Sequence, residues 1–227
     1  MYSTTVSKSP SPPMLKTSKP AGAQQTRSLR TEASLLAAAA RVLDRDGLDG
    51  ATVPRIAAEA KFSPASIYRR FADKDDLLRA TFLRTLEAST AASAASLRAS
   101  VLRPKLSATV TALVGSLLKG YREHPQLLRA MNRMIEAAPH SPFAKEALKR
   151  IVAQLAHAAD VLLTHRDSIR HPDPERAARF AVLAATSAIE LAALDQTSLW
   201  HIALPLSDKA FAAELSRQML AYLRRKR

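Results

Sequence analysis

From Leu29 onwards, apolar side chains recur at the three- and four-residue spacings of amphipathic helices. The first helix is predicted over residues 31–47, because Thr31 can cap its N-terminus and Gly47 can end it. Glu32 suits the first turn, where a negative charge favours the helix dipole. One face of this helix carries Leu36, Ala39, Ala40 and Leu43.

Two short helices are predicted next, separated by about four residues. Thr52 caps the first of them, which ends near Lys61. Ser63 and Pro64 begin the second, since a capping hydroxyl followed by proline at the first helical position is a strong start signal. That helix is predicted to run to about Phe71.

Longer helices make up the rest of the chain. Asp73 caps a helix that is predicted to continue to about Leu102. Beyond it, prolines separate apolar-periodic segments, and no alternating β-branched run occurs. The pattern predicts an all-α fold with about nine helices. The later segments cover residues 105–123, 126–137, 143–166, 174–200 and 207–225.

Composition excludes several kinds of site. The 227 residues include no cysteine, which rules out disulfides, thiolate metal sites and a cysteine nucleophile. No apolar run reaches the ~18 residues of a membrane-spanning helix, since Glu190 interrupts the longest candidate, residues 180–194. The sequence has no Gly-rich phosphate loop and no GxSxG motif, and His157 and His165 are too far apart for an i, i+4 metal pair. We therefore expect no enzyme activity, no metal and no cofactor.

The charge of the chain is strongly basic but unevenly placed. Lysine and arginine number 34 against 20 acidic residues, a formal net charge of +14. Residues 1–30 are basic without any acid, whereas residues 31–97 are neutral, with nine charges of each sign. Residues 98–170 hold the largest excess. A basic balance favours an anionic partner, either nucleic acid or a membrane surface.

Residues 1–28 are rich in Ser, Thr, Pro and Lys and hold almost no large apolar side chain. They are predicted to be disordered, because they cannot bury enough surface to offset the entropy of ordering. They lack both the apolar run of a secretory signal and the amphipathic arginine pattern of a transit peptide. Such a basic arm either follows DNA phosphates or is an inert tail.

Two short helices joined by about four residues, the second rich in basic and hydroxyl side chains, are typical of a helix-turn-helix unit, whose second helix enters the DNA major groove. Residues 52–82 resemble the N-terminal domain of the TetR family of transcriptional regulators, and read TVPRIAAEAKFSPASIYRRFADKDDLLRATF. The last two-thirds of the chain match that family in helical pattern only. The positions in agreement are Thr52, Ile56, Ala57, Ala60, Ser63, Tyr68, Phe71, Lys74, Leu77 and Leu78.

The resemblance implies DNA-backbone contacts by Tyr68 and Lys74 and a phosphate contact by Thr52. One position departs from the family pattern, since Lys61 stands where the turn commonly has glycine. A left-handed lysine costs about 1 kcal/mol. We expect the turn to survive, slightly strained or reshaped, with Lys61 free to approach a phosphate.

The resemblance also implies that exposed positions of the second short helix supply the remaining contacts. An arginine can grip guanine O6 and N7, worth about 1–3 kcal/mol of discrimination, whereas hydroxyls suit phosphate oxygens. Arg55 is a further phosphate candidate. Phe62 and Phe71 are expected in the core, and the Tyr68 ring is expected to pack with its hydroxyl on the DNA backbone. Ser63, which precedes this helix, is a further DNA-binding candidate, and the recognition positions are Pro64, Ala65, Ser66, Arg69 and Arg70.

The resemblance further implies a two-fold dimer built from the last two long helices of each subunit. Small side chains among the large ones permit close helix approach, and paired recognition helices match pseudo-palindromic operators. The alternative is that both apolar stripes are intramolecular core. The dimer positions are Phe180, Leu183, Ala184, Ser187, Ala188, Leu191, Leu194, Phe211, Leu215, Met219 and Tyr222.

Residues 105–166 would enclose the family's effector pocket. Each candidate lining residue is also an ordinary core residue. The basic excess here favours an anionic or carboxylate-bearing effector, or else reflects only solvated arginine and lysine on the surface. The candidates are Leu113, Leu117, Tyr121, Met131, Met134, Ile135, Phe143, Leu155 and Leu162.

Together these patterns predict a disordered arm at residues 1–28, a helix-turn-helix DNA-binding domain at 29–75 and a helical ligand-binding and dimerisation domain at 76–227. We expect a cytoplasmic homodimer, a repressor that leaves a palindromic double-stranded DNA operator when a small-molecule effector binds. The effector would move the helix at residues 73–102 and spread the two reading heads. The alternative is a basic helical protein that binds anionic membranes or non-specific nucleic acid without ligand response.

Overall fold

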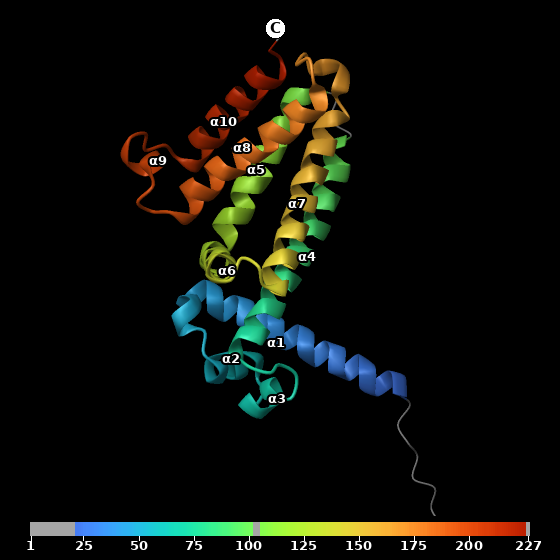
Figure 1. Ribbon diagram of the computed structural model, residues 1–227, viewed down its shortest axis with the longest axis vertical. Coiled ribbons are helices and arrows are strands. Elements are labelled where there is room, and N and C mark those ends of the chain that lie inside the picture. The colour runs from blue at the N-terminus through green and yellow to red at the C-terminus, as the bar shows by residue number, and fades with distance from the viewer. Residues whose placement is uncertain (1–20, 102–104, 226–227) are drawn as a thin grey trace, which may run out of the picture.

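The computed structural model describes residues 21–101 and 105–225, with side chains for 25–91 and 105–225. This described part confirms the predicted all-α fold, with ten α-helices, one 3-10 turn and no strand. In Figure 1 a small head of short helices lies below a bundle of longer ones. The elements are α1 (Ala21–Gly50), α2 (Val53–Ala60), α3 (Pro64–Tyr68), α4 (Lys74–Val101), α5 (Leu106–Glu123), α6 (Pro125–Ala137), α7 (Pro142–Leu163), η1 (Arg166–Ser168), α8 (Pro174–Leu194), α9 (Leu199–Ile202) and α10 (Asp208–Leu223).

The head has its own core. Helices α1, α2 and α3 pack around the first turns of α4, where Ile56, Ile67 and Phe82 are fully buried. Helix α6 covers this core from above, since Leu127 and Met131 belong to the same apolar cluster. Burial of each large side chain contributes about 1.5–3 kcal/mol, so the head holds the short helices at fixed angles.

Asp44 joins the head to the bundle at the start of α6. Its Oδ2 lies 2.5 Å from Nδ1 of His124, and its Oδ1 accepts a hydrogen bond from the backbone N–H of Leu127 at 3.2 Å. An aspartate that accepts from the first N–H groups of a helix satisfies donors that have no partner within the helix. The position of α6 is therefore coupled to that of α1.

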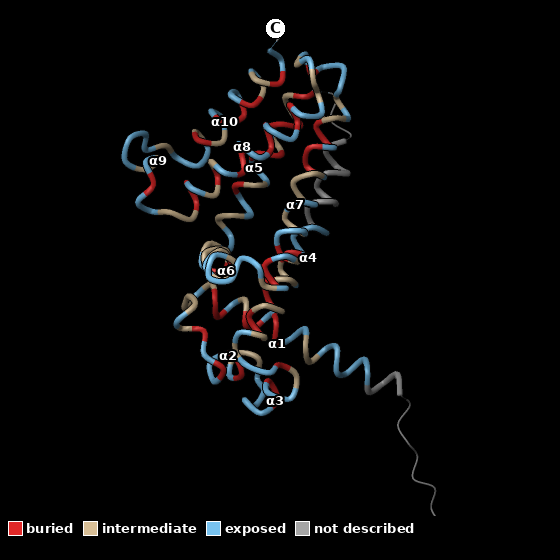
Figure 2. The backbone as a smooth tube through the Cα atoms, viewed as in Figure 1, coloured by how far each residue is buried: buried red, intermediate tan, exposed pale blue. Residues whose placement is uncertain are grey.

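The bundle encloses a second core between α5, α7, α8 and α10. The inner face of α8 is built largely from alanine, which lets neighbouring helices approach closely. Figure 2 shows buried residues along the inner sides of these helices. Among the described helices, only α8 is long and apolar enough to cross a membrane, and half of that apolar window is buried in the bundle. Its composition is therefore that of a bundle's core helix.

The first helix begins earlier in the chain than predicted. Helix α1 begins at Ala21, and Thr31 is not its cap, because Thr31 Oγ1 donates to the carbonyl oxygen of Arg27 at 3.0 Å inside the helix. The prediction of disorder is therefore wrong for residues 21–28, while residues 1–20 lie outside the described residues. Alanine, glutamine and arginine are good helix formers, and they extend a helix whose later turns are packed.

Other predicted helix ends also move. Helix α3 ends at Tyr68 rather than near Phe71, and α8 ends at Leu194 rather than near residue 200. Asp195 Oδ1 accepts from both the N–H and the hydroxyl of Thr197, which turns the chain towards the separate helix α9. The predicted break at Gly47 is present as a left-handed residue with φ 70°.

Candidate nucleic-acid interface

The α2–turn–α3 unit begins where the backbone of Thr52 is extended, before α2. Ile56 and Ala57 point into the head core, so the opposite side of α2 faces outward. At the end of α2, the N–H of Lys61 donates to Ala58 at 3.0 Å and the N–H of Phe62 to Ala57 at 2.9 Å. These two bonds close the helix and set the direction of the turn.

Lys61 adopts the left-handed conformation that its place in the turn demands, with φ 59° and ψ 39°. It is the one residue other than glycine with positive φ among those described. The expected strained turn is confirmed. The Lys61 side chain is exposed, beside the gap between α2 and α3.

Helix α3 buries one of its predicted recognition positions. Ser66 is only 6% exposed; its Oγ lies 3.1 Å from that of Ser63 and accepts a hydrogen bond from Nη2 of Arg69 at 3.1 Å. The expectation that Ser66 faces DNA is therefore wrong, because with Ile67 it lies on the inner side of this short helix. Its hydroxyl instead orients the arginine.

The remaining predicted contacts divide into an outer set and an inner set. Tyr68 is 58% exposed, so its ring lies in solvent rather than packed as expected. The outer residues are all exposed and belong to α2, α3 and the segments that flank them, where Figure 2 shows many exposed residues. We call these eight exposed residues the reading surface: Thr52, Arg55, Lys61, Ser63, Pro64, Ala65, Tyr68 and Arg69.

The inner set consists of Arg70 and Lys74, which bond within the head. Arg70 is half-buried and its Nη1 donates to the carbonyl oxygen of Ser66 at 3.4 Å. Nζ of Lys74 donates to the carbonyl oxygen of Leu48 at 3.1 Å. Both side chains therefore support the reading surface, and Lys74 must leave Leu48 before it can grip a phosphate.

The aromatic predictions are half correct. Phe71 is buried in the head core. Phe62, expected there as well, is 36% exposed, because the left-handed turn at Lys61 aims it outward.

Two acidic side chains of the head, Glu59 and Asp46, are paired with arginine. Glu59 accepts from Arg41 at 2.8 Å and from Arg45 at 3.2 Å, and these hydrogen bonds lower the pKa of its carboxyl group. Asp46 bonds to Arg45 and lies 3.7 Å from Arg55, and its pKa is lowered as well, mainly by Arg45. The carboxylates stay ionised and paired, which leaves less repulsion towards a phosphate backbone.

The predicted dimer stripe on α8 faces outward. Phe180 and Leu183 are each more than half exposed, and Leu191 nearly so. Ala184 and Ser187 are exposed between them, and Ala188 and Leu194 are half-buried. Large exposed apolar side chains along one helix are typical of a face that another protein covers.

The predicted stripe on α10 faces inward instead. Phe211, Leu215 and Met219 are buried in the bundle core of their own chain, so the intramolecular alternative holds for them. Tyr222 is half-buried, and its ring lies 5.2 Å from that of Phe180. The stripe is intramolecular because α10 has to cover α5 and α8 within one chain.

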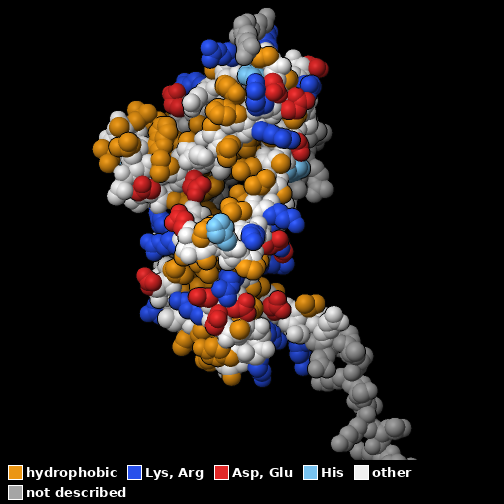
Figure 3. Space-filling view, in the orientation of Figure 1, with side chains coloured by type: hydrophobic (Ala, Val, Ile, Leu, Met, Phe, Trp, Pro, Cys, Tyr) orange, Lys and Arg blue, Asp and Glu red, His pale blue; other side chains and the backbone are white. Residues whose placement is uncertain are grey.

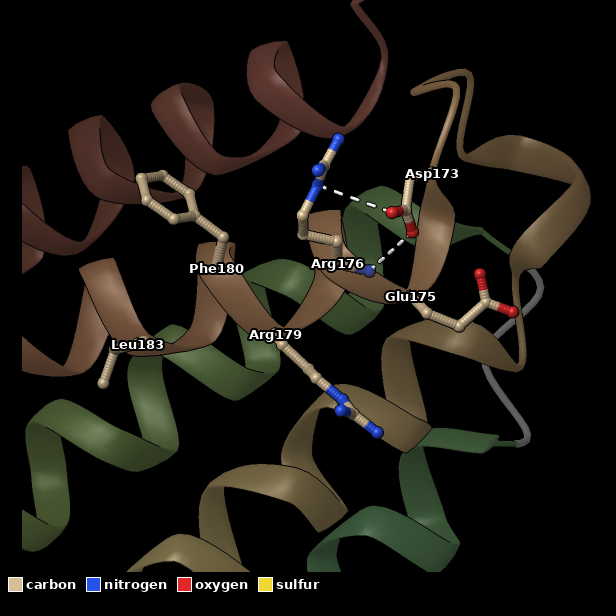
Figure 4. Close-up of a pocket in the computed structure, with 6 residues that line it drawn as sticks. All are labelled: Asp173, Glu175, Arg176, Arg179, Phe180 and Leu183. Carbon is tan, nitrogen blue, oxygen red and sulfur yellow. Dashed lines mark hydrogen bonds and ion pairs between the residues drawn. The ribbon is translucent and has the colours of Figure 1, made fainter.

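A hollow of about 420 Å³ interrupts the outer face of α8. Figure 4 shows Phe180 turned towards α10, Arg176 bonded to Asp173, and Arg179 pointing away from both. The hollow is lined by Asp173, Glu175, Arg176, Arg179, Phe180 and Leu183. It is open to one side and shares none of the predicted effector residues.

The nine predicted effector residues are split between the two cores. Met131, Phe143, Met134 and Ile135 lie in or against the head core. Leu113, Leu117, Tyr121, Leu155 and Leu162 lie in or against the bundle core. Neither of the two cavities described, one on α8 and one between α4 and α7, is lined by any of these nine residues.

Polar bridges that sequence reasoning missed connect the two cores. Asn132 Nδ2 donates to Glu190 at 2.6 Å, and Nε of Arg129 donates to the carbonyl oxygen of Leu194 at 2.5 Å. Burial and the nearby Glu190 carboxylate raise the pKa of the Tyr121 hydroxyl. The signal available in the sequence was Glu190 itself, the one charged residue between Phe180 and Leu194.

A second missed cluster joins α4 to α7. Arg150 donates to Glu146 and to Glu87, both at 2.7 Å, and to the carbonyl oxygen of Leu83 at 3.1 Å. We call these residues the α4–α7 clasp. The i, i+4 spacing of Glu146 and Arg150 was visible in the sequence, but the partner on α4 was not.

No group of three or more metal-ligating side chains was found among the described residues.

Comparison with known families covers both parts of the chain. The model for bacterial regulatory proteins of the tetR family matches residues 35–81. The model for the C-terminal domain of tetracyclin repressor-like proteins matches residues 105–223, which is more than half of the sequence. No curated protein sequence matches the chain.

Solved structures show the same fold at low sequence identity. A TetR-family transcriptional regulator from Mesorhizobium loti superposes with a TM-score of 0.66 at 20% identity, covering 87% of this chain and 96% of that one. A TetR transcription regulator from Haloarcula marismortui gives 0.62 at 20% identity, covering 86% and 97%. FadR from Bacillus subtilis, in complex with stearoyl-CoA, gives 0.55 at 15% identity, covering 84% and 97%.

Proposed function

The chain belongs to the TetR family of transcriptional regulators, and we propose that it is a repressor which leaves a two-fold DNA operator when a small molecule binds. The observation that carries the proposal is the reading surface, where eight exposed residues of α2, the turn and α3 lie beside a rigid core. This arrangement suits insertion of α3 into a major groove. We expect a cytoplasmic site of action, because the protein has to reach the DNA that carries its operator.

Arg69 is the residue best placed to read a base. It is exposed at the end of α3, and its hydrogen bond to Ser66 orients the guanidinium. Guanidinium groups match guanine O6 and N7. Thr52, Ser63 and Tyr68 supply hydroxyls that suit phosphate oxygens, which position the head without specifying sequence.

A homodimer gives the second reading head. The outward face of α8 supplies the apolar surface, and the exposed Leu199 and Ile202 of α9 add to it. Figure 3 shows apolar side chains gathered over this α9 segment. A two-fold axis through such a face would repeat the reading surface on the other side of the operator.

Helix α4 is the element through which an effector would act. It begins in the head, packs against α7 in the bundle, and is held there by the α4–α7 clasp. A small molecule that favours a different tilt of α4 would change the separation of the two heads. It must bind the released form more tightly than the bound form, because equal affinity shifts nothing. The stearoyl-CoA bound by the B. subtilis FadR supports a small molecule as the class of effector.

The proposal is tested by release of the protein from its own operator. A selected operator duplex, labelled with a fluorophore, is titrated to saturation, and small molecules are then added while anisotropy is followed. At least one compound should lower operator affinity tenfold or more and raise the melting temperature of the free protein. If compounds that raise the melting temperature leave the operator complex intact, the effector-release mechanism is wrong.

A further inference from the structure

The first turns of α1 extend beyond the packed part of the molecule. Residues 25–30 are all exposed, and Leu29 is 61% exposed. The first fully buried residue of the helix is Leu35. At 1.5 Å per residue, the stretch from 25 to 35 spans about 15 Å. Figure 1 shows it projecting from the head, the end of the molecule that carries α2 and α3.

This extension continues a stripe of arginines along α1. At 100° per residue, Arg27, Arg30, Arg41 and Arg45 fall within about 60° of the helix circumference. Arg41 and Arg45 both bond to Glu59, so the stripe runs along the α2 side of the helix. The extension therefore presents Arg27 and Arg30 on the same side of α1 as the side that contacts α2.

The two outer arginines differ from the two inner ones in having no acid to pair with. Arg27 and Arg30 form no ion pair with any described carboxylate. The sequence holds no acidic residue before Glu32, which lies about 140° around the helix from Arg27. Two adjacent unpaired guanidinium groups on an exposed helix form a purely cationic surface.

We infer that the extension of α1 is a third DNA-binding element, in which Arg27 and Arg30 bind backbone phosphates that flank each half-site. The inference rests on the proposed function. Guanidinium groups bind phosphate oxygens through paired hydrogen bonds. An anionic membrane is a poorer partner, because a helix that lies on a membrane needs a broad apolar face, and Leu29 is the only large apolar side chain in residues 25–34.

The experiment compares wild type with the double variant Arg27→Ala, Arg30→Ala. Alanine preserves the helix, which circular dichroism checks. The matched control is Arg224→Ala, Arg225→Ala, which removes the same charge from exposed residues at the far end of the molecule. Each protein binds a duplex that ends at the half-sites and a longer duplex with flanking sequence. A third variant, Arg27→Lys, Arg30→Lys, keeps the charge.

On the long duplex, the slope of log affinity against log salt should fall by about 1.8 per protomer in the alanine variant, with the control unchanged and the lysine variant near wild type. In the alanine variant, ethylation of the phosphates that flank each half-site should no longer interfere with binding. On the short duplex, all four proteins should give the same slope of log affinity against log salt.

An unchanged slope on the long duplex, with operator binding intact, would overturn the inference and leave the proposed function standing. If wild type selects no DNA sequence, both fail. Loss of binding to vesicles of anionic phospholipid, without any change on DNA, would assign the extension to a membrane and also overturn it.

Discussion

Lys61 shows how a single residue sets the geometry of the reading surface. It takes a left-handed conformation at the end of α2, where its N–H and that of Phe62 close the helix. The same conformation turns Phe62 outward. The left-handed conformation of a lysine costs folding free energy. At this position, however, the ammonium group lies beside the proposed path of a DNA phosphate.

Replacement of Lys61 by glycine should raise the free energy of unfolding by about 1 kcal/mol, because glycine adopts this conformation without steric strain. Chemical denaturation measures it. Lys105→Gly is the control, since Lys105 is also exposed but has φ −133°, and it should bring no gain. Equal effects at both positions would show that Lys61 is unstrained. If Lys61 also contacts a phosphate, the salt slope should fall by about 0.9 per protomer.

Arg69 and Arg70 are adjacent but should behave differently. Arg69→Ala should weaken operator binding by about 1–3 kcal/mol, because its guanidinium is exposed on the reading surface. Arg70→Ala removes a side chain that folds back onto Ser66, so its effect on discrimination between operator and random DNA should be smaller. Competition binding measures the ratio. The reverse order would contradict the assignment.

At the scale of elements, helix periodicity was enough to find almost every helix and the turn unit. Local signals misplaced ends wherever tertiary contacts or neighbouring propensity outweighed a cap, as at Thr31 and at the end of α8. It was harder to predict from the sequence which apolar and polar residues are buried and which are exposed. Ser66 and the α10 stripe were assigned to surfaces, yet a short helix and a covering helix bury them. Periodicity identifies an apolar face but not the partner that covers it.

The outward face of α8 predicts a change of oligomeric state on mutation. Leu183→Asp places a charge in the middle of that face and should give a monomer near the chain mass of 24.6 kDa in sedimentation experiments. Val152→Asp is the matched control, because Val152 is a comparably exposed apolar residue on α7. It should remain dimeric. A dimeric Leu183→Asp protein would exclude this face as the interface.

The α4–α7 clasp should contribute measurably to stability. Arg150→Met should lower the free energy of unfolding by about 1 kcal/mol, since it removes the hydrogen bonds to Glu146, Glu87 and the Leu83 carbonyl. Arg176→Met, at an exposed ion pair, should change it by less than about 0.5 kcal/mol. Arg150 lowers the pKa of Glu146. The stability that this ion pair contributes is therefore complete above pH 4.5, the ordinary pKa of the glutamate carboxyl group. It is lost as the pH falls through the lower pKa of Glu146 in the folded protein. Equal losses in both variants would contradict the clasp.

At the scale of the whole molecule, the two cores are joined by shared helices and by polar contacts. Helix α7 contributes Phe143 and Ala147 to the head core and Ala158 and Leu162 to the bundle core, and α4 runs from the head core along α7. Asp44 fixes the start of α6 to α1, and Asn132 and Arg129 connect α6 to α8. The net charge of +14 is absent from residues 31–97, which are neutral. DNA recognition is thus attributed to the placement of a few cations, and the excess elsewhere adds general attraction.

The most direct test is selection of bound duplexes from a random-sequence pool by the wild-type protein. We predict enrichment of inverted half-sites whose centres are one helical turn, about 10 base pairs, or a multiple of it apart. The Leu183→Asp variant should enrich single half-sites weakly or not at all. No enrichment by wild type, or enrichment of sequences without two-fold symmetry, would contradict the account of a dimer that reads DNA through two copies of α3.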